Sequence, residues 1–117
     1  MELTEITYDD AVPIDGYGPG FFRVDGKVMN GAVLVTADAV RPWDGLEDVA
    51  PLLALAGQVD IVILGLGADM PGLPADLIDA LEQADIGVEV MASPNACRTY
   101  NVLLAEGRRI ALAALPV

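Results

Sequence analysis

The feature that most constrains the fold is a short apolar run near the middle of the chain. The segment from Asp60 to Leu66 contains the run Ile-Val-Ile-Leu, which is rich in β-branched residues. A wholly apolar run of this length is typical of a central strand that is covered on both faces. From about residue 45 onward, helix-like and strand-like segments alternate along the chain. This alternation predicts a largely parallel or mixed sheet with helices packed on it.

Three segments have the spacing of apolar residues that predicts a helix. The first is expected to begin near Asp48 and to end at Gly57, because Pro51 fits only the first turn of a helix. The second is expected over Pro74–Ala84 and the third over Ser93–Glu106. These three helices are expected to cover the sheet.

The first third of the chain is typical of strands joined by turns. Asp25-Gly26 lies between two strand-like runs and predicts a tight hairpin turn. The segment Asp15–Gly20 has three glycines and one proline, so we expect a loop there. Strands are expected over Phe21–Val24, Lys27–Met29, Gly31–Thr36, Gly87–Met91 and Arg109–Leu115. The segment Leu3–Tyr8 alternates loosely and could form a further short strand. The predicted fold is a single α/β domain over residues 1–117, with a mixed sheet and the order β-β-β-α-β-α-β-α-β.

The composition excludes several classes of function. The chain has 117 residues, 18 of them acidic and 6 basic, for a formal charge of −12. Nucleic acids and anionic membranes are poor partners, because binding phosphate needs a basic surface. There is no histidine, and the single cysteine excludes an intrachain disulfide and a metal site built from several cysteines. The carboxylates of Asp44, Glu47 and Asp48 lack the spacing of a metal site, so we expect no metal, and we expect no cofactor. The N-terminus lacks a secretion signal and no run is long enough to span a membrane, so a cytoplasmic location is expected.

The start of the third predicted helix is the strongest candidate for a binding site. Ser93 is expected to be its N-cap, and Pro94 suits its first turn. Free N–H groups and the helix dipole attract anions at such a position, and Arg98 could close on a bound anion. The alternative is an ordinary capped helix whose arginine pairs with an acidic residue.

Other residues near this helix start complete the candidate site. The sequence Gly65-Leu66-Gly67 follows the central strand but lacks the third glycine of a dinucleotide loop, so we expect a tight turn beside a crevice. An asparagine in the middle of a helix is mildly unfavourable, so Asn101 is expected to hydrogen-bond the backbone of a neighbouring loop. The predicted ligand or partner site comprises Gly65, Gly67, Ser93, Asn95, Arg98, Tyr100 and Asn101.

Cys97 lies beside Arg98 near the start of this helix, where a thiol can be activated. However, it shares a helix face with Ala96, Tyr100, Leu103 and Leu104. That face is expected to be core, and no histidine exists to activate the thiol. We therefore expect an inert, buried cysteine.

Several stretches of the sequence resemble those of one protein family. The most specific is Ser93-Pro94-Asn95-Ala96-Cys97-Arg98-Thr99-Tyr100-Asn101, and the segments Gly16–Gly26 and Asp60–Gly67 and the tryptophan at position 43 support it. The chain is similar over residues 2–117 to a bacterial and archaeal family of unknown function. That family includes the mitochondrial NADH dehydrogenase (complex I) assembly factor 3. The resemblance implies a three-layer α/β domain around a mixed sheet with one antiparallel strand, and it supplies no catalytic residues.

Two hypotheses about function follow. The first, implied by the resemblance, is a non-enzymatic accessory protein that takes part in assembling a membrane complex, peripheral to the inner membrane through a partner. The apolar content of 54% also favours a face covered by a partner or a second copy of the chain. Trp43 and Phe21-Phe22-Arg23 are candidate contact residues by type, although a core position is the alternative for the aromatic rings. The second hypothesis is a protein or enzyme that binds a small anionic ligand at Ser93 and Arg98.

Overall fold

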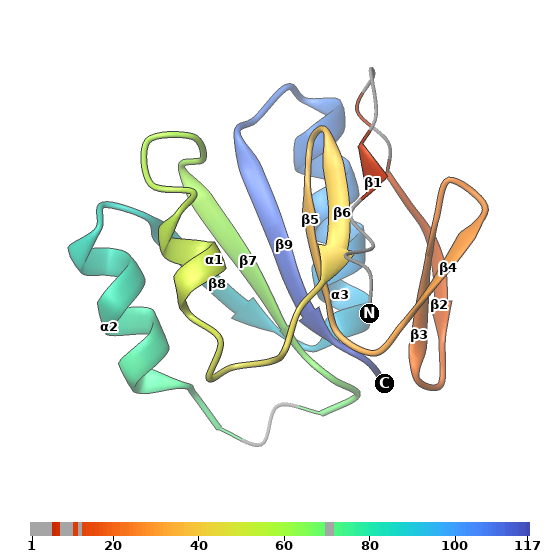
Figure 1. The fold of residues 1–117 in the computed structure, drawn as a ribbon, viewed down its shortest axis with the longest axis horizontal. Helices are drawn as coiled ribbons and strands as arrows, with labels where there is room; N and C mark the ends of the chain where they lie inside the picture. The colour runs from red at the N-terminus through yellow and green to blue at the C-terminus, as the bar shows by residue number, and fades with distance from the viewer. Residues whose placement is uncertain (1–5, 8–10, 12, 70–71) are drawn as a thin grey trace.

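Two β-sheets and three helices make up the part of the chain that the structure describes. This computed structural model describes residues 6–7, 11, 13–69 and 72–117 (Figure 1). A six-stranded sheet has the order β1-β6-β5-β9-β7-β8, and a three-stranded sheet has the order β2-β3-β4. The larger sheet contains β1 (Ile6–Thr7), β5 (Val33–Thr36), β6 (Ala39–Pro42), β7 (Ile61–Leu66), β8 (Gly87–Met91) and β9 (Ile110–Leu115). The smaller sheet contains β2 (Ile14–Gly18), β3 (Phe21–Val24) and β4 (Lys27–Asn30), and the helices are α1 (Ala50–Leu53), α2 (Ala75–Gln83) and α3 (Ser93–Ala105).

The six-stranded sheet is mixed, as the sequence predicts. The strand β7 pairs in parallel with both β8 and β9. The pairs β9–β5, β5–β6 and β6–β1 are antiparallel. Two strands, β5 and β1, therefore run opposite to the other four, where the resemblance implies one. The predicted central strand is therefore correctly placed, because β7 has a neighbour on each side and is buried from Val62 to Leu66.

Helices cover both faces of this sheet, so the expected layers are confirmed. The helix α3 lies on one face, and α1 and α2 lie on the other (Figure 1). Successive side chains of a strand point to opposite faces, and β9 shows this clearly. Its residues Leu112 and Ala114 join the core beneath α3, whereas Ala111 and Ala113 join the core beneath α1 and α2.

The three-stranded sheet packs on the same side as α3. Phe22, Val24 and Met29 from this sheet belong to the same core cluster as Tyr100 of α3. The turn between β3 and β4 has the predicted tight geometry, because both Asp25 and Gly26 have positive φ angles of 52° and 74°.

The expected loop over Asp15–Gly20 is wrong, because most of this segment is the strand β2. It pairs with β3 along its length, with Gly18 opposite Phe21. A Cβ atom at Gly18 would lie 2.5 Å from Cε2 of Phe21, so the glycine lets the aromatic ring lie over the strand. The chain then turns at Pro19-Gly20, where Gly20 has a φ angle of 79°.

Two further elements differ from their predicted extents. Six strands of the described residues precede α1, where the predicted order has three. The strand β6, over Ala39–Pro42, was not predicted, and β2 was expected to be a loop. The strand β1 lies within Leu3–Tyr8, whose other residues lie outside the described part of the chain. The first helix is shorter than the expected 48–57, although Pro51 lies in its first turn as predicted. The second helix begins at Ala75, one residue later than expected, with Pro74 as its N-cap.

Candidate functional site

Ser93 joins three segments at the carboxyl end of the parallel strands. Its hydroxyl accepts a hydrogen bond from the N–H of Gly67 at 2.9 Å and donates one to the carbonyl oxygen of Leu115 at 2.5 Å. Its own N–H donates to the carbonyl oxygen of Gly67 at 2.8 Å. The expected N-cap role is wrong, because Ala92 is the N-cap and no side chain caps the helix. The hydroxyl is instead used to connect α3 with the ends of β7 and β9.

The two predicted glycines are required by this junction. A Cβ atom at Gly65 would lie 2.7 Å from the Ser93 oxygen and 3.0 Å from the Ser93 Cα atom. Gly67 has a φ angle of 83°, which residues other than glycine rarely adopt. The structure thus brings Gly65, Gly67 and Ser93 together, as predicted, but in direct contact with one another.

The start of α3 has few groups left for an anion. The N–H of Ser93 is bonded to Gly67, and Pro94 has no N–H. The Asn95 side chain accepts a hydrogen bond from the guanidinium of Arg98, and both residues are exposed. This pairing is local, within one turn of the helix, and it places Arg98 beside α3 at the surface.

Asn101 forms a paired contact with the first residue of β2. Its side-chain oxygen accepts from the N–H of Ile14 at 2.8 Å, and its amide donates to the carbonyl oxygen of Ile14 at 2.9 Å. The predicted backbone partner is therefore confirmed. The partner belongs to the start of a strand, and the contact fastens the three-stranded sheet to α3.

Tyr100 is fully buried in the core beneath α3. Its hydroxyl has no hydrogen-bond partner among the described residues. Burial raises the pKa of this phenol well above its usual range, and the nearby carboxylate of Asp38 raises it further. At neutral pH Tyr100 is an uncharged core residue.

Cys97 is buried in the same core, as predicted. Burial raises the pKa of its thiol to about 11, and the charge of Arg98 lowers it only in part. The thiolate is the reactive form of cysteine, so little of it is present at neutral pH.

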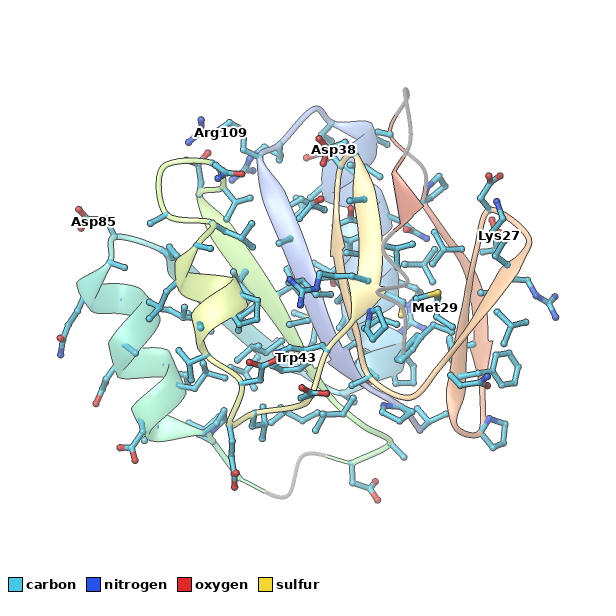
Figure 2. All side chains as sticks on the ribbon, in the orientation of Figure 1. Lys27, Met29, Asp38, Trp43, Asp85 and Arg109 are labelled. Atoms are coloured by element: carbon cyan, nitrogen blue, oxygen red, sulfur yellow. The ribbon has the colours of Figure 1, made fainter. Side chains whose placement is uncertain are left out.

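The predicted contact aromatics occupy core positions. Trp43 is buried beneath α1, and its indole N–H donates to the carbonyl oxygen of Asp48 at 2.9 Å (Figure 2). Phe22 is fully buried, whereas Phe21 is half-buried and Arg23 is exposed. These rings stabilise the folded chain and present little surface to a partner.

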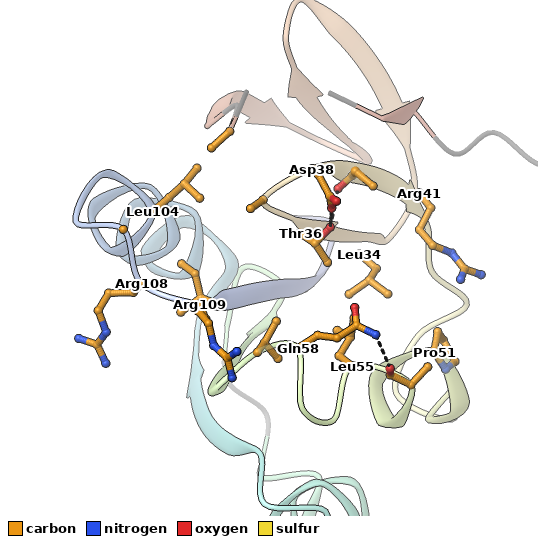
Figure 3. A pocket seen from close by; sticks show the side chains of 17 residues that line it. Leu34, Thr36, Asp38, Arg41, Pro51, Leu55, Gln58, Leu104, Arg108 and Arg109 are labelled. Carbon is orange, nitrogen blue, oxygen red and sulfur yellow. Dashed lines mark hydrogen bonds between the residues drawn. The ribbon is translucent and has the colours of Figure 1, made fainter. Parts of the chain in front are cut away.

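A groove that was not predicted from the sequence lies at the opposite end of the sheet, where β7 and β9 begin. Its volume is about 740 Å³, and it lies between the end of α1, the β5–β6 turn and the segment that joins α3 to β9 (Figure 3). Asp38 and Arg109 mark this end of the molecule in Figure 2. Arg108-Arg109, the one adjacent pair of basic residues in the sequence, was the available signal for it.

None of the helices in the described part of the chain is both long enough and apolar enough to cross a membrane.

Comparisons with known proteins identify the relatives of this chain. An uncharacterized protein of Rhodobacter capsulatus is 52% identical over 117 residues, which cover 100% of this chain and 94% of that protein. The human NADH dehydrogenase (ubiquinone) 1 alpha subcomplex assembly factor 3 is 33% identical over 113 residues, or 91% of this chain and 61% of that protein. The Danio rerio assembly factor of the same name is 32% identical over 110 residues, or 88% and 63%. The chain thus spans less than two thirds of the length of these assembly factors.

Solved structures share the same fold. A crystal structure of an outer membrane protein from Bartonella henselae matches with a TM-score of 0.83 and 29% identity, over 94% of this chain and 98% of that one. An NMR structure of a Rhodopseudomonas palustris protein matches with a TM-score of 0.77 and 31% identity, over 95% and 90%. The family model described as protein of unknown function (DUF498/DUF598) matches residues 14–115. The chain is therefore a member of the DUF498/DUF598 family.

Proposed function

We propose that this protein is an accessory factor in the assembly of respiratory complex I, and that it acts by contacting other proteins rather than by catalysis. The observation that carries this proposal is the extent of the similarity to assembly factor 3. It covers 91% of the chain for the human protein and 88% for the Danio rerio protein. The similarity therefore extends over most of the chain and is not confined to one short motif.

The state of the polar side chains in the predicted site supports a role in binding proteins. Nucleophilic catalysis needs an activated side chain that a substrate can reach. Ser93 is buried with its hydroxyl bonded, and the Cys97 thiol is buried with a raised pKa. These residues serve the fold, which favours an accessory role over a catalytic one.

The surface offers places for such contacts. Of the seven residues of the predicted site, Asn95 and Arg98 are exposed, and they are the members that we propose can touch a partner. Val102 is 57% exposed one turn further along α3. Other large apolar side chains at the surface are Tyr17, Val28, Leu53 and Leu73. Exposed apolar residues are common contact residues in protein interfaces.

Affinity capture tests the proposal. The tagged protein is expressed at its native level in its own organism and isolated with and without mild detergent, and bound proteins are quantified by mass spectrometry. A tagged protein of similar size and charge serves as the control. We expect complex I subunits to be enriched over this control, most strongly with detergent. Recovery of this chain alone, with or without bound small molecules, would contradict the proposal.

A further inference from the structure

We infer that the groove beside α1 binds an acidic segment of a partner protein, in which carboxylates flank an aliphatic side chain. This inference rests on the proposed function, because it assumes that the ligand is a polypeptide. It concerns a surface on the opposite end of the sheet from Ser93, so it is independent of the site predicted from the sequence.

Half of the basic residues of this acidic chain line the groove. The chain carries only 6 basic residues against 18 acidic ones. Three of the six, Arg41, Arg108 and Arg109, line this one groove. The described lining includes one carboxylate, Asp38, which accepts a hydrogen bond from the hydroxyl of Thr36 at 3.0 Å. A concentration of positive charge on an otherwise acidic protein favours an acidic partner and speeds its approach.

Arg41 lines the groove and has a hydrogen-bond donor without a partner among the described residues. It lies on β6 directly opposite Leu34 of β5, so the two side chains share the sheet face that lines the groove. Its Nε atom is buried and has no hydrogen-bond partner within the described residues. A buried polar group without a partner is costly, and a carboxylate can accept two parallel hydrogen bonds from a guanidinium. Because Nε is buried, the Arg41 side chain must turn toward the groove before a ligand carboxylate can supply the missing acceptor.

The arginines lie on two sides of the groove, and apolar side chains lie between them. In Figure 3, Arg41 lies on one side of the groove and Arg108 and Arg109 lie on the other, with Leu34 and Leu55 between them. This separation favours an extended ligand with two acidic groups over a single compact anion. The apolar floor between the charges suits an aliphatic side chain.

The existing ion pair at the groove leaves the positive charge available. Arg109 contacts the carboxylate of Asp60 at 3.0 Å, and the two side chains are 56% and 59% exposed. Exposed ion pairs of this kind contribute little to stability, so a ligand can compete for Arg109 at little cost. Arg108 is exposed. The groove volume of about 740 Å³ can receive several side chains of a bound segment.

The test uses peptide arrays and the full chain. One array carries peptides of about ten residues, which extend to about 33 Å, composed of Asp, Glu, Leu, Ile and Ser. A matched array has Lys and Arg in place of Asp and Glu. The best acidic peptide is then labelled with fluorescein, and its dissociation constant is measured by anisotropy at a salt concentration of about 150 mM. We expect the protein to bind peptides of the acidic array more strongly than those of the basic array. Binding should weaken as the salt concentration is raised.

Matched variants locate the binding. Arg41→Gln is expected to raise the dissociation constant of the labelled peptide about tenfold, equivalent to about 1.4 kcal/mol. Arg108→Gln removes an exposed charge without touching the core and is expected to raise this constant about threefold. Lys27→Gln removes the same charge from the hairpin of the smaller sheet, far from the groove, and should leave binding unchanged (Figure 2). The exposed position of Arg108 keeps the test valid even if Arg41→Gln disturbs folding.

Three results would overturn the inference. The first is equal binding to the acidic and basic arrays, and the second is equal loss of binding in Arg108→Gln and Lys27→Gln. The third concerns laurate, a small amphiphilic acid. If no acidic peptide binds, but laurate protects the protein against thermal unfolding and this protection needs Arg41 and Arg108, the inference is wrong. Complex I subunits captured equally well by the wild type and both groove variants would contradict this inference alone. Failure of the wild type to capture them would contradict the proposed function, whatever the arrays show.

Discussion

At the scale of single residues, the Ser93 hydroxyl holds together segments that are far apart in the sequence. It bonds both the N–H that follows β7 and the carbonyl oxygen at the end of β9, and it is fully buried. The sequence predicted that a helix begins at Ser93 and that a turn lies at Gly65-Leu66-Gly67. It could not predict that the hydroxyl serves the sheet, because that depends on Leu115, which is 22 residues away.

Removing this hydroxyl is expected to destabilise the fold without changing its surface. Ser93→Ala leaves a buried N–H and a buried carbonyl without their partner, which should lower the free energy of unfolding by about 2 kcal/mol. Urea denaturation of wild type and variant measures the difference. A change within error would show that water or a backbone shift replaces the hydroxyl.

The contact between Gly65 and Ser93 leads to a second prediction. Gly65→Ala places a Cβ atom 2.7 Å from the Ser93 oxygen and 3.0 Å from a backbone carbon, so the strand or helix must move. We expect a loss of about 1–3 kcal/mol in the free energy of unfolding. Gly16→Ala is the control, because nothing lies within 4 Å of the added Cβ atom and its φ angle is not positive. Equal losses in the two variants would refute this explanation.

The raised pKa of Cys97 predicts how stability depends on pH. In the folded protein the thiol pKa is about 11, whereas in the unfolded chain it is near 9.0. The unfolded state therefore loses its proton first as pH rises, so stability falls between about pH 9 and pH 11, by about 2 kcal/mol. Cys97→Ala should lack this part of the fall and keep the part that comes from Tyr100. Identical pH profiles for wild type and variant would contradict a buried, protonated thiol.

At the scale of elements, the connection between α3 and β2 determines how the smaller sheet is attached. Asn101 satisfies both backbone groups of Ile14, much as a neighbouring strand would. The sequence indicated that Asn101 needed a backbone partner but could not say which one. The reason is that β2 was itself predicted as a loop, because its glycines are typical of loops. Its pairing with β3 is seen only in the three-dimensional structure.

This attachment can be tested with two substitutions. Asn101→Ala should lower the free energy of unfolding by about 1–3 kcal/mol, because both backbone groups of Ile14 lose their partners. Asn101→Asp keeps an acceptor for the Ile14 N–H but places a second acceptor against the Ile14 carbonyl oxygen, so it should destabilise the protein as well. Hydrogen exchange at the Ile14 amide should become faster in Asn101→Ala and stay slow at β7. Unchanged exchange at Ile14 would show that Asn101 does not hold β2 in place.

At the scale of the whole molecule, the two ends of the six-stranded sheet differ in character. Three residues of the predicted site, Gly65, Gly67 and Ser93, lie at the carboxyl end of the parallel strands, where they contact one another. The open groove lies at the other end, where Arg41 comes from β6 and Arg108 from the segment before β9. The sequence indicated the layers and the central strand, because hydrophobic periodicity is local. It did not indicate the groove, because β6 was not predicted and its pairing brings Arg41 to that end.

The proposed role in assembly belongs to this scale as well, and the most direct test is the amount of assembled complex I in cells that lack the protein. The gene is deleted in its own organism, and complex I is quantified by native gel electrophoresis and by its NADH oxidation activity in membranes. We predict a clear loss of assembled complex, an accumulation of partial assemblies and recovery when the wild-type chain is restored. An unchanged amount of assembled, active complex I in the deletion strain would contradict the central claim.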